Sequence, residues 1–534
     1  MGRPGGAGDR DEGGSEVKAH GPAVRTSFRL AAAATFCAAS VLAAGCKGGT
    51  FDTRAADQAA PYRTEYRPVA SIQTPDGFRA VLIAEGFNYP SSMTWDAAGK
   101  LYVLESHTVP IPTLKVKVMR IGAAGELEEI ALRGPGAPTG AVAIGMEFHD
   151  GWIYLSHEEK DGTWGISRFR PDTGDTEAVL RGLPGNGDHN VNYLVFDREG
   201  SLYFGIGSAT NSGVVSSNDP VNKKWLEKRP QVHDVPCKDI VLTGQTFTDS
   251  NEMTDTAGDE AKTGAYQAYG KSDASRVAGE PLCMSSLYRL RKGSTAPELV
   301  AWGLRNPVAL AIDAKGTLFV GMHGADIRST RPILDDPDAV YRLKPGAWYG
   351  WPDFSAELHP ITDARYRPPD KFLSKGQTGL SFAIDHRASG LSAPDRSLLV
   401  TATVPHAALG GMTVVPARGP FSRWAGQLLI SEMGDFKPQT DPVKPDERAG
   451  FQVESVDLAT GTRTVFARNR GTGAPQPASR IDLEEGFERP VDVKVGPDGL
   501  VYVLDFGVFN PTEKVVKVFP KTGRVYRIEP GTPR

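Results

Sequence analysis

A short pattern that recurs six times along the 534-residue chain is the strongest constraint on its fold. Each copy is a turn that contains glycine, followed directly by aromatic and β-branched residues, as in Asp96-Ala-Ala-Gly-Lys-Leu-Tyr-Val-Leu. Glycine supplies the positive φ that a tight turn requires, and the residues after it have the composition of a half-buried strand. The six turn glycines are Gly99, Gly151, Gly200, Gly316, Gly426 and Gly499.

A second strand-like segment follows every copy of the first. These six segments begin at Val118, Ile166, Leu287, Val340, Val453 and Val525. Repeated pairs of strands predict an all-β fold, a six-bladed β-propeller whose blades surround a central channel. The high content of turn-forming residues, with 60 Gly and 40 Pro, agrees with many short strands. Because the copies are unequally spaced, a different barrel or a sandwich is the alternative.

The unequal spacing also predicts where long insertions interrupt the propeller. The first two intervals between turn glycines suit a compact four-stranded blade, whereas the intervals on either side of Gly316 are much longer. We therefore expect a propeller over residues 73–534, preceded by a linker over 47–72, with insertion loops at about 208–286 and 351–395. Long loops on a rigid scaffold are common places for binding residues.

Residues 1–46 are predicted to be an N-terminal extension with a signal peptide. Arg25 and Arg29 precede an apolar run from Leu30 to Gly45, which is too short to cross a bilayer as a helix. The Ala-Ala-Gly-Cys sequence resembles a bacterial lipoprotein signal, so we expect lipidation of Cys46 and membrane attachment through that lipid alone. The protein is then periplasmic or on the cell surface. The alternative is ordinary cleavage near Ala44, with Cys46 unmodified.

Export bears on the remaining cysteines, Cys237 and Cys283. Two cysteines in an oxidising compartment predict one disulfide, which closes the first insertion; two free thiols are the alternative. No Cys-x-x-Cys pair and no His-Glu-x-x-His motif occurs, which argues against zinc chemistry of those kinds. The balance of 60 Lys+Arg and 64 Asp+Glu argues against nucleic-acid binding, which needs a basic surplus.

Polar residues precede several of the strands predicted to line the channel. If each of these strands runs up to its glycine turn, residues at similar offsets before the turns should meet at one mouth of the channel. The residues selected in this way are His189, Arg305, Asn306 and Arg489, with His406 before a longer loop. For any one of them, a capping or loop-bonding role is the simpler interpretation.

The combination of these residue types indicates a chemistry. A neutral histidine accepts a proton, and the neighbouring Asp188 can orient that histidine or bind a substrate. Two guanidinium groups bind planar carboxylates by paired hydrogen bonds. Together they suit an anionic small ligand beside a proton acceptor, and hence the oxidation of an alcohol with an external electron acceptor.

Three motifs carry a resemblance to a known family: Gly187-Asp-His-Asn, Gly303-Leu-Arg-Asn-Pro and Trp348-Tyr-Gly-Trp-Pro. From about Gly77 to Pro530 the chain resembles the glucose/sorbosone dehydrogenases, six-bladed propellers typified by soluble glucose dehydrogenase that depends on pyrroloquinoline quinone (PQQ). The resemblance implies PQQ and Ca²⁺ as cofactors, a sugar or polyol as substrate, and a separate electron acceptor.

The resemblance also implies roles for individual residues. It implies catalysis by His189 and Arg305, with His189 as the general base, and contact of Asp188 with the sugar. Cofactor contacts fall on Arg305, Asn306 and Arg489, and the backbone carbonyls of Gly324 and Ala325 are expected to bind Ca²⁺. His406 has no counterpart in the glucose enzymes and is expected to contact the substrate or to replace a missing contact.

Two departures from the family keep other functions open. The segment 428–434 lacks the cofactor-binding lysine of the family, and Val491 stands where a second arginine is expected. These departures favour, as the alternative, a non-catalytic propeller that binds a glycan or a protein partner. A lactonase-like hydrolase is a third class, but such enzymes hold Ca²⁺ with side-chain carboxylates, and no comparable carboxylate set is expected here.

Overall fold

The computed structural model describes residues 62–531, except for 107–114, 123–124, 186, 218, 220–224 and 513–515. Cys46 and the rest of the predicted signal segment lie outside the described residues. In the described part, antiparallel strands form six sheets of four or five strands each, and helical structure is confined to short turns. No helix in this part is long and apolar enough to span a membrane.

Blades 1 to 3 are four-stranded sheets built in sequence order. Blade 1 contains β4 (Pro90–Trp95), β5 (Leu101–Glu105), β6 (Lys117–Ile121) and β7 (Leu127–Ile130). Blade 2 contains β8 (Ala143–His149), β9 (Trp152–Glu158), β10 (Trp164–Phe169) and β11 (Thr176–Leu183). Blade 3 contains β12 (Val191–Phe196), β13 (Leu202–Ile206), β18 (Ser286–Leu290) and β19 (Glu298–Trp302).

Blades 4 to 6 complete the set, and the last two carry additional N-terminal strands. Blade 4 contains β20 (Pro307–Ile312), β21 (Leu318–Met322), β22 (Pro337–Arg342) and β23 (Leu399–Pro405). Blade 5 contains β24 (Leu409–Val414), β25 (Leu428–Glu432), β26 (Gln452–Val456), β27 (Arg463–Asn469) and β2 (Ile72–Gln73). Blade 6 contains β28 (Pro490–Val495), β29 (Val501–Asp505), β32 (Gly523–Pro530), β3 (Phe78–Phe87) and β1 (Arg63–Pro68).

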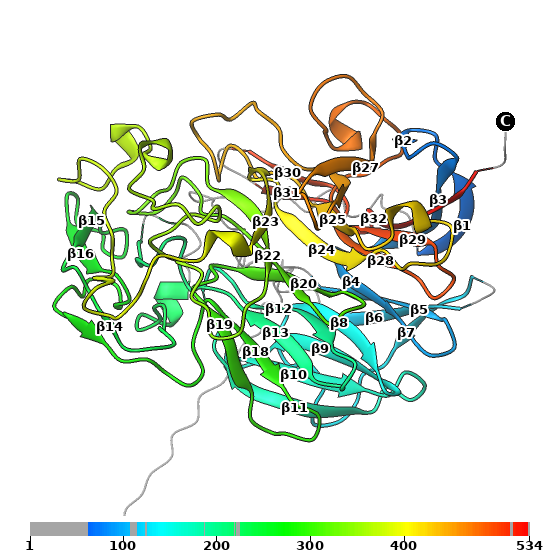
Figure 1. The fold of residues 1–534 in the computed structure, drawn as a ribbon, viewed down its shortest axis with the longest axis horizontal. Coiled ribbons are helices and arrows are strands. Elements are labelled where there is room, and N and C mark those ends of the chain that lie inside the picture. Colours follow the sequence, from blue (N-terminus) through cyan, green and yellow to red (C-terminus); the bar gives the residue numbers. More distant parts are fainter. Residues whose placement is uncertain are drawn as a thin grey trace, which may run out of the picture. The chain divides into compact units, whose positions relative to one another are not determined.

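The first strand of each blade packs against the first strand of the next, and β28 of blade 6 packs against β4 of blade 1. These six inner strands gather around the middle of the view in Figure 1. The contacts therefore close a ring, and the predicted six-bladed propeller is confirmed. All six turn glycines have positive φ and join the first strand of a blade to the second. The second predicted segments are the third strands of the blades.

The ring closes through backbone pairing between the two ends of the described chain. β3 pairs with β32 along its length, and β1 pairs with the outer edge of β3. The segment 47–72, predicted to be a linker, thus supplies strand β1 and half of the two-residue strand β2. β1 reads Arg-Thr-Glu-Tyr-Arg-Pro and has no buried residue, so it joins the sheet through its backbone and leaves no apolar pattern in the sequence.

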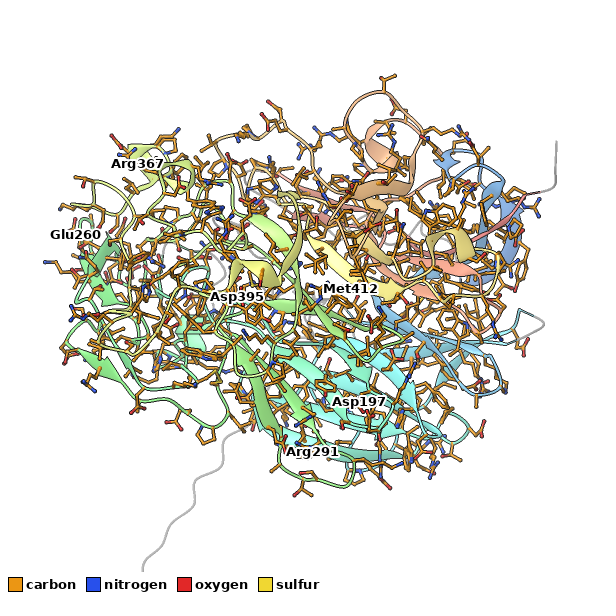
Figure 2. All side chains as sticks on the ribbon, in the orientation of Figure 1. Asp197, Glu260, Arg291, Arg367, Asp395 and Met412 are labelled. Carbon is orange, nitrogen blue, oxygen red and sulfur yellow. A yellow bond between two sulfur atoms is a disulfide. The ribbon has the colours of Figure 1, made fainter. Side chains whose placement is uncertain are left out.

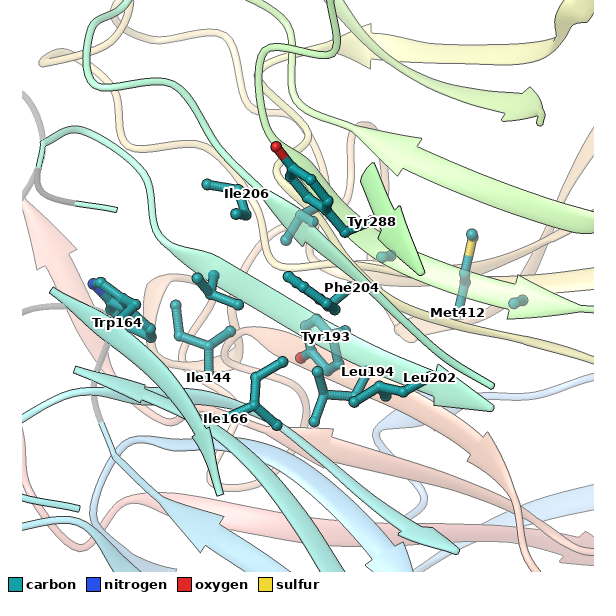
Figure 3. Packing of buried hydrophobic residues seen from close by; sticks show 14 of the residues in the cluster. Ile144, Trp164, Ile166, Tyr193, Leu194, Leu202, Phe204, Ile206, Tyr288 and Met412 are labelled. Atoms are coloured by element: carbon teal, nitrogen blue, oxygen red, sulfur yellow. The ribbon is translucent and has the colours of Figure 1, made fainter. Parts of the chain in front are cut away.

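Side chains from neighbouring blades interlock to form the core. Figure 3 shows Ile166 of blade 2 packed near Leu194 and Leu202 of blade 3, all of them buried. Removal of this apolar area from water, at about 25 cal/mol per Å², stabilises each blade against its neighbours. Each blade packs against two neighbouring blades, and this packing holds the start of every inner strand in place around the ring.

All six inner strands carry an irregularity close to their first residue. The pairing register with the second strand shifts there in every blade, for example between Pro307 and Ala309 and between Pro490 and Asp492. A bulge turns the local side chains away from strict alternation. Polar residues at the strand starts can therefore face the propeller axis.

Both predicted insertions are present. The first lies between β13 and β18 and contains β14 (Ile240–Val241) paired with β17 (Arg276–Val277), and β15 (Thr246–Ser250) paired with β16 (Glu260–Gly264). The second lies between β22 and β23 and contains three short 3₁₀ turns, the first at Ala364–Tyr366. The predicted Cys237–Cys283 disulfide is confirmed within the first insertion.

The two insertions pack on each other. The amide of Thr243 donates to the carbonyl of Ala383 at 3.0 Å, and Lys375 pairs with Glu260 at 2.7 Å. Below them the guanidinium of Arg331, which is buried, pairs with buried Asp353 at 2.7 Å. Figure 2 places Glu260 and Arg367 together at one edge of the view, well apart from Met412 of inner strand β24. The insertions thus form one accessory body on the propeller.

We expect the disulfide to stabilise this accessory body. Closing a loop with a sequence separation of 46 residues restricts the unfolded chain by about 4 kcal/mol at most. The double variant Cys237→Ser/Cys283→Ser should therefore lose up to that amount of unfolding free energy, measured by chemical denaturation. An unchanged midpoint and slope in the double variant would show that the bond does not contribute.

Candidate active site

A cavity of about 350 Å³ lies where the six inner strands begin. Its wall includes at least one residue from the start of each inner strand or just before it: Ser91, Val142, Asn190, Asn306, Leu409 and Val491. The side chain of Tyr193, in β12 of blade 3, extends across the propeller axis toward blades 1 and 6. Its hydroxyl lies 2.6 Å from the carbonyl of Ser91 in blade 1 and 3.0 Å from that of Val491 in blade 6. Tyr193 therefore forms part of the floor.

Most of the predicted site residues line this single cavity. They are Asp188, His189, Arg305, Asn306, Gly324 and His406. Residues from blades 3, 4 and 5 are thus brought together, as the radial arrangement predicts. Gly207 makes room for two of them, because a Cβ atom there would lie 2.3 Å from Cβ of His189 and 2.7 Å from Oδ1 of Asn306.

The hydrogen bonds of His189 define which ring nitrogen carries its proton. Nδ1 lies 3.1 Å from the carbonyl oxygen of Ser208. A carbonyl can only accept, so Nδ1–H is the donor and Nε2 carries the lone pair in the neutral ring. Nε2 is 3.7 Å from Oδ2 of Asp188. A proton taken up by Nε2 would therefore lie beside a carboxylate.

The surroundings of His189 keep it neutral. The pKa of this imidazole is lowered from 6.5 to about 3, mainly by burial and also by the positive charges of Arg305 and Arg328, which together outweigh the opposing effect of Asp188. In the ligand-free protein at neutral pH the ring is thus an unprotonated acceptor with a fixed tautomer.

A network of arginines and aspartates surrounds Asp188. Arg328 donates to Asp188, to Asp219 at 2.7 Å and to Asp326 at 2.9 Å. Arg305 lies 3.5 Å from Asp188 through its NH2 group. Although burial opposes ionisation, the positive charges of Arg328 and Arg305 hold the pKa of Asp188 below its usual value. Asp188 is therefore ionised, and its Oδ1 has no hydrogen-bond partner among the described residues.

Asn306 belongs to a second network that crosses three blades. Its Oδ1 accepts from Asn192 at 2.7 Å, and its Nδ2 lies 3.1 Å from Nδ1 of His323. Nε2 of His323 in turn lies 2.6 Å from the carbonyl of Leu409 and must donate to it. These contacts with Asn192 and His323 hold Asn306 in one orientation.

His406 joins blade 4 to the cavity wall. Its Nδ1 lies 3.3 Å from Oδ1 of Asp326, and its φ of 66° places it in the left-handed region. Strained backbone of this kind is costly for a residue other than glycine, and it is concentrated at functional sites. Nε2 of His406 is buried and without a hydrogen-bond partner within residues 62–531 as described, so it can receive a ligand group.

The structure differs from the prediction at Arg489, which does not line the cavity. Its guanidinium donates to the carbonyls of Phe509 at 3.0 Å, Gly434 at 2.8 Å and Asp435 at 3.1 Å. Burial lowers its pKa to about 10. The predicted contact with a cofactor carboxylate is not available in this arrangement, because backbone acceptors of blade 5 already hold the side chain.

The predicted calcium carbonyls are also differently placed. The carbonyl of Gly324 accepts from NH1 of Arg305 at 2.6 Å, and Ala325 is not among the residues that line the cavity. Among the described residues, no cluster of three or more His, Cys, Asp and Glu side chains is arranged to hold a metal. A Ca²⁺ ion at Gly324 would have to compete with a guanidinium that already occupies the carbonyl.

Sequence reasoning missed several charged residues of the wall. Asp326, Arg328 and Asp336 lie between β21 and β22, and Asp338 lies in β22. The aspartates contradict the expectation that carboxylates do not converge here. They are nevertheless satisfied: Asp336 accepts from the amides of Ala325 and Ala356, and Asp338 accepts from those of Gly324 and Leu409. No repeated offset marks this connection in the sequence.

A buried lysine lies just beyond the segment in which the family lysine is missing. Lys437 follows β25 and pairs with Asp441 at 3.0 Å, and Asp441 lies 3.8 Å from Nε2 of His406. Blade 5 therefore does place an ammonium group near His406. The signal was present in the sequence, but outside the window 428–434.

No protein-family model and no curated protein matches the sequence. Among solved structures, the chain is similar to PQQ-bound aldose sugar dehydrogenase of Streptomyces coelicolor, with 16% identity, a TM-score of 0.45, and coverage of 87% of this chain and 99% of that chain. It is also similar to the apo form of soluble aldose sugar dehydrogenase of Escherichia coli, with 16% identity, a TM-score of 0.46, and coverage of 85% of this chain and 100% of that chain. A third similar structure is the holo PQQ domain of pyranose dehydrogenase from Coprinopsis cinerea, with 14% identity, a TM-score of 0.49, and coverage of 88% of this chain and 98% of that chain.

These three structural neighbours are named as sugar dehydrogenases, the kind of enzyme that the motifs resemble. At these identities and TM-scores they assign no residue roles to this chain. The propeller itself follows from the strand pairing described above.

The size of the cavity suits the planar ring of a quinone, but the arginines expected to bind the carboxylates of PQQ are not free. Its volume of about 350 Å³ suits a flat ring, and Arg305, Arg328 and His406 can reach polar groups on the edge of such a ring. PQQ carries three carboxylates, however, and both cavity arginines are already paired with aspartates. Binding of PQQ therefore requires these ion pairs to be shared or rearranged.

We expect acid to destabilise the protein through His189. Because its folded-state pKa is about 3 and its unfolded value about 6.5, the unfolded chain binds more protons between these values. This group alone should lower the free energy of unfolding by about 1.4 kcal/mol for each pH unit below 6.5. Urea denaturation from pH 7 to 4 should show a weaker loss in His189→Gln than in wild type.

His149, which stacks on Phe196 outside this cavity, provides the control. The variant His149→Gln should keep the wild-type dependence on pH. An identical dependence in wild type and His189→Gln would contradict a neutral, buried His189.

Proposed function

We propose that the axial cavity oxidises an alcohol group of a sugar or related polyol, with PQQ as the electron acceptor. The observation that carries the proposal is the fixed tautomer of His189, which presents Nε2 as a proton acceptor beside ionised Asp188. Oxidation of sugars is also what the names of the similar solved structures state for those proteins.

The residues of the chain can carry the proton part of this reaction. His189 accepts the hydroxyl proton at Nε2, and the negative charge of Asp188 at 3.7 Å stabilises the imidazolium that forms. The donated hydrogen bond from Nδ1 to Ser208 prevents the ring from turning. Loss of the proton raises electron density on the substrate oxygen and favours departure of hydride from the same carbon.

A bound quinone supplies the two-electron acceptor for that hydride. Arg305, Arg328 and His406 are the residues placed to hold it, and the guanidinium groups would stabilise negative charge on its oxygens. We also propose that Ca²⁺ binds at the carbonyl of Gly324. There it would displace the guanidinium of Arg305, which now donates a hydrogen bond to that carbonyl.

A second candidate function is a binder of glycans without redox chemistry. The specific observation in its favour is that the positive charges in the cavity wall are neutralised internally. Arg328 is held by three aspartates, and Arg305 lies 3.5 Å from both Asp188 and Asp326. A neutral sugar needs hydrogen bonds rather than net charge, and this cavity can supply them.

We also propose that the protein works outside the cytoplasmic membrane, tethered by a lipid on Cys46. The apolar run before Cys46 and the confirmed disulfide support export. In the native host the protein should fractionate with membranes, and Cys46→Ser should release it. Wild-type protein recovered in the soluble fraction with an unmodified Cys46 by mass spectrometry would contradict the tether.

The enzyme proposal is tested by reconstitution of purified protein with PQQ and Ca²⁺ and by dye reduction across a panel of sugars. We expect His189→Gln to lower kcat by about 10²- to 10⁴-fold, because proton transfer by a positioned group contributes that much. The same variant should change the Kd for the sugar by no more than a few-fold.

His149→Gln is the matched control and should retain full activity. Absence of dye reduction by wild type with every sugar, together with sugar binding that survives in His189→Gln, would overturn the enzyme and favour the binder.

A further inference from the structure

The cavity has a mainly polar and a mainly apolar half. The charged and amide side chains come from blades 3 to 5 and from the connection between β21 and β22, although apolar side chains such as Val308 and Phe436 also line this half. The opposite wall is formed by side chains of blades 1, 2 and 6 and of the first insertion. Its apolar members are Val142, Ile144, Trp164, Trp225 and Val491. Two charged residues also belong to this wall, but both have protein partners: Glu158 accepts from the amide of Ala141 at 3.4 Å, and Arg229 donates to the carbonyl of Asp161 at 3.4 Å.

Two tryptophans from different elements bound the apolar half. Trp164 begins β10 and is 2% exposed, whereas Trp225 lies in the first insertion and is 9% exposed. Gly185 leaves space for the indole of Trp164, since a Cβ atom there would lie 2.6 Å from its Cδ1. In Figure 3, Trp164 lies near Ile144.

One polar atom in this half has no hydrogen-bond partner in the protein. Nε1 of Trp225 is buried and unpaired within the part of the chain that the structure describes. A buried indole N–H normally finds an acceptor, because leaving it unpaired costs free energy. An acceptor on a ligand would satisfy it.

A free monosaccharide does not match this wall. Its hydroxyl groups surround the ring on every side, and those facing Val142, Ile144 and Val491 would lose their hydrogen bonds to water without replacement. The polar half alone, with His189, Asp188 and Arg305, already provides the contacts that one hydroxylated group needs.

We infer that the substrate is amphipathic: a sugar or polyol head that carries an apolar substituent, with the head at His189 and the substituent between Trp164 and Trp225. This inference rests on the proposed function only for the identity of the head group. The aliphatic side chains of the apolar wall favour an alkyl or aryl substituent over a second sugar ring, which would need polar partners on its edges.

Binding to the protein without cofactor tests the inference separately from activity. The probes are glucose, maltose and the methyl, butyl and hexyl β-D-glucosides, with Kd measured by calorimetry below micelle-forming concentrations. We expect the Kd to fall about three- to fourfold for each added methylene, in keeping with the transfer free energy of a buried CH₂ group. Glucose and maltose should bind most weakly.

Trp225→Ala should weaken the binding of hexyl glucoside at least tenfold and leave that of glucose unchanged. The control is Trp152→Ala: Trp152 lies under Arg168 and Arg170 in blade 2 and lines a different groove, so its removal should alter neither affinity. Trp225→Phe should retain most of the chain-length dependence, because a phenyl ring keeps the apolar contact.

A Kd that does not vary with chain length would overturn the inference. Equal loss of glucose and hexyl glucoside in Trp225→Ala, or maltose binding as tight as that of hexyl glucoside, would also overturn it. If no sugar supports dye reduction but the Kd still falls with chain length, the proposed oxidation is wrong and the inference of an amphipathic ligand stands. If glucose supports dye reduction but the Kd does not vary with chain length, the proposed oxidation stands and the inference of an amphipathic ligand is wrong.

Discussion

The whole arrangement depends on closure of the ring by backbone hydrogen bonds between distant parts of the chain. Strand β3 completes blade 6 by pairing with β32, β1 adds to the outer edge of β3, and β28 of the same blade packs against β4 of blade 1. Without this pairing, blades 1 and 6 would each lose a neighbour, and His189, Arg305 and His406 would not be held around one axis. Side chains of the core stabilise the individual blades, but this backbone pairing closes the six blades into a ring.

The chemistry of the cavity depends on internal charge balance. Asp188 lies between an imidazole held neutral and two arginines, and Arg328 is shared with Asp219 and Asp326. Buried groups of this kind stabilise little in themselves, but removing one partner leaves an uncompensated charge at large cost. The network therefore keeps His189 and Asp188 in place, and a charged ligand must exchange partners with it when it binds.

The repeated features of the fold could be predicted from the sequence because they are local. Glycines at positive φ, such as Gly99 and Gly499, and the cysteine pair are visible as patterns, and both predictions hold. Convergence of His189 with Arg305 followed from equal offsets in different blades. Arg489 lies outside the cavity wall because its guanidinium bonds to backbone carbonyls, and a sequence does not display such partners. Arg328 and Asp326 were missed because they lie in the loop between β21 and β22, which contains none of the repeated motifs. Strand β1 was missed because it pairs through its backbone and has no buried side chain.

The position of Tyr193 has a consequence for turnover. Its hydroxyl spans from blade 3 to carbonyls of blades 1 and 6 and so obstructs passage along the propeller axis. A ligand of this cavity therefore enters and leaves from the same end of the channel, so one molecule must depart before the next can arrive.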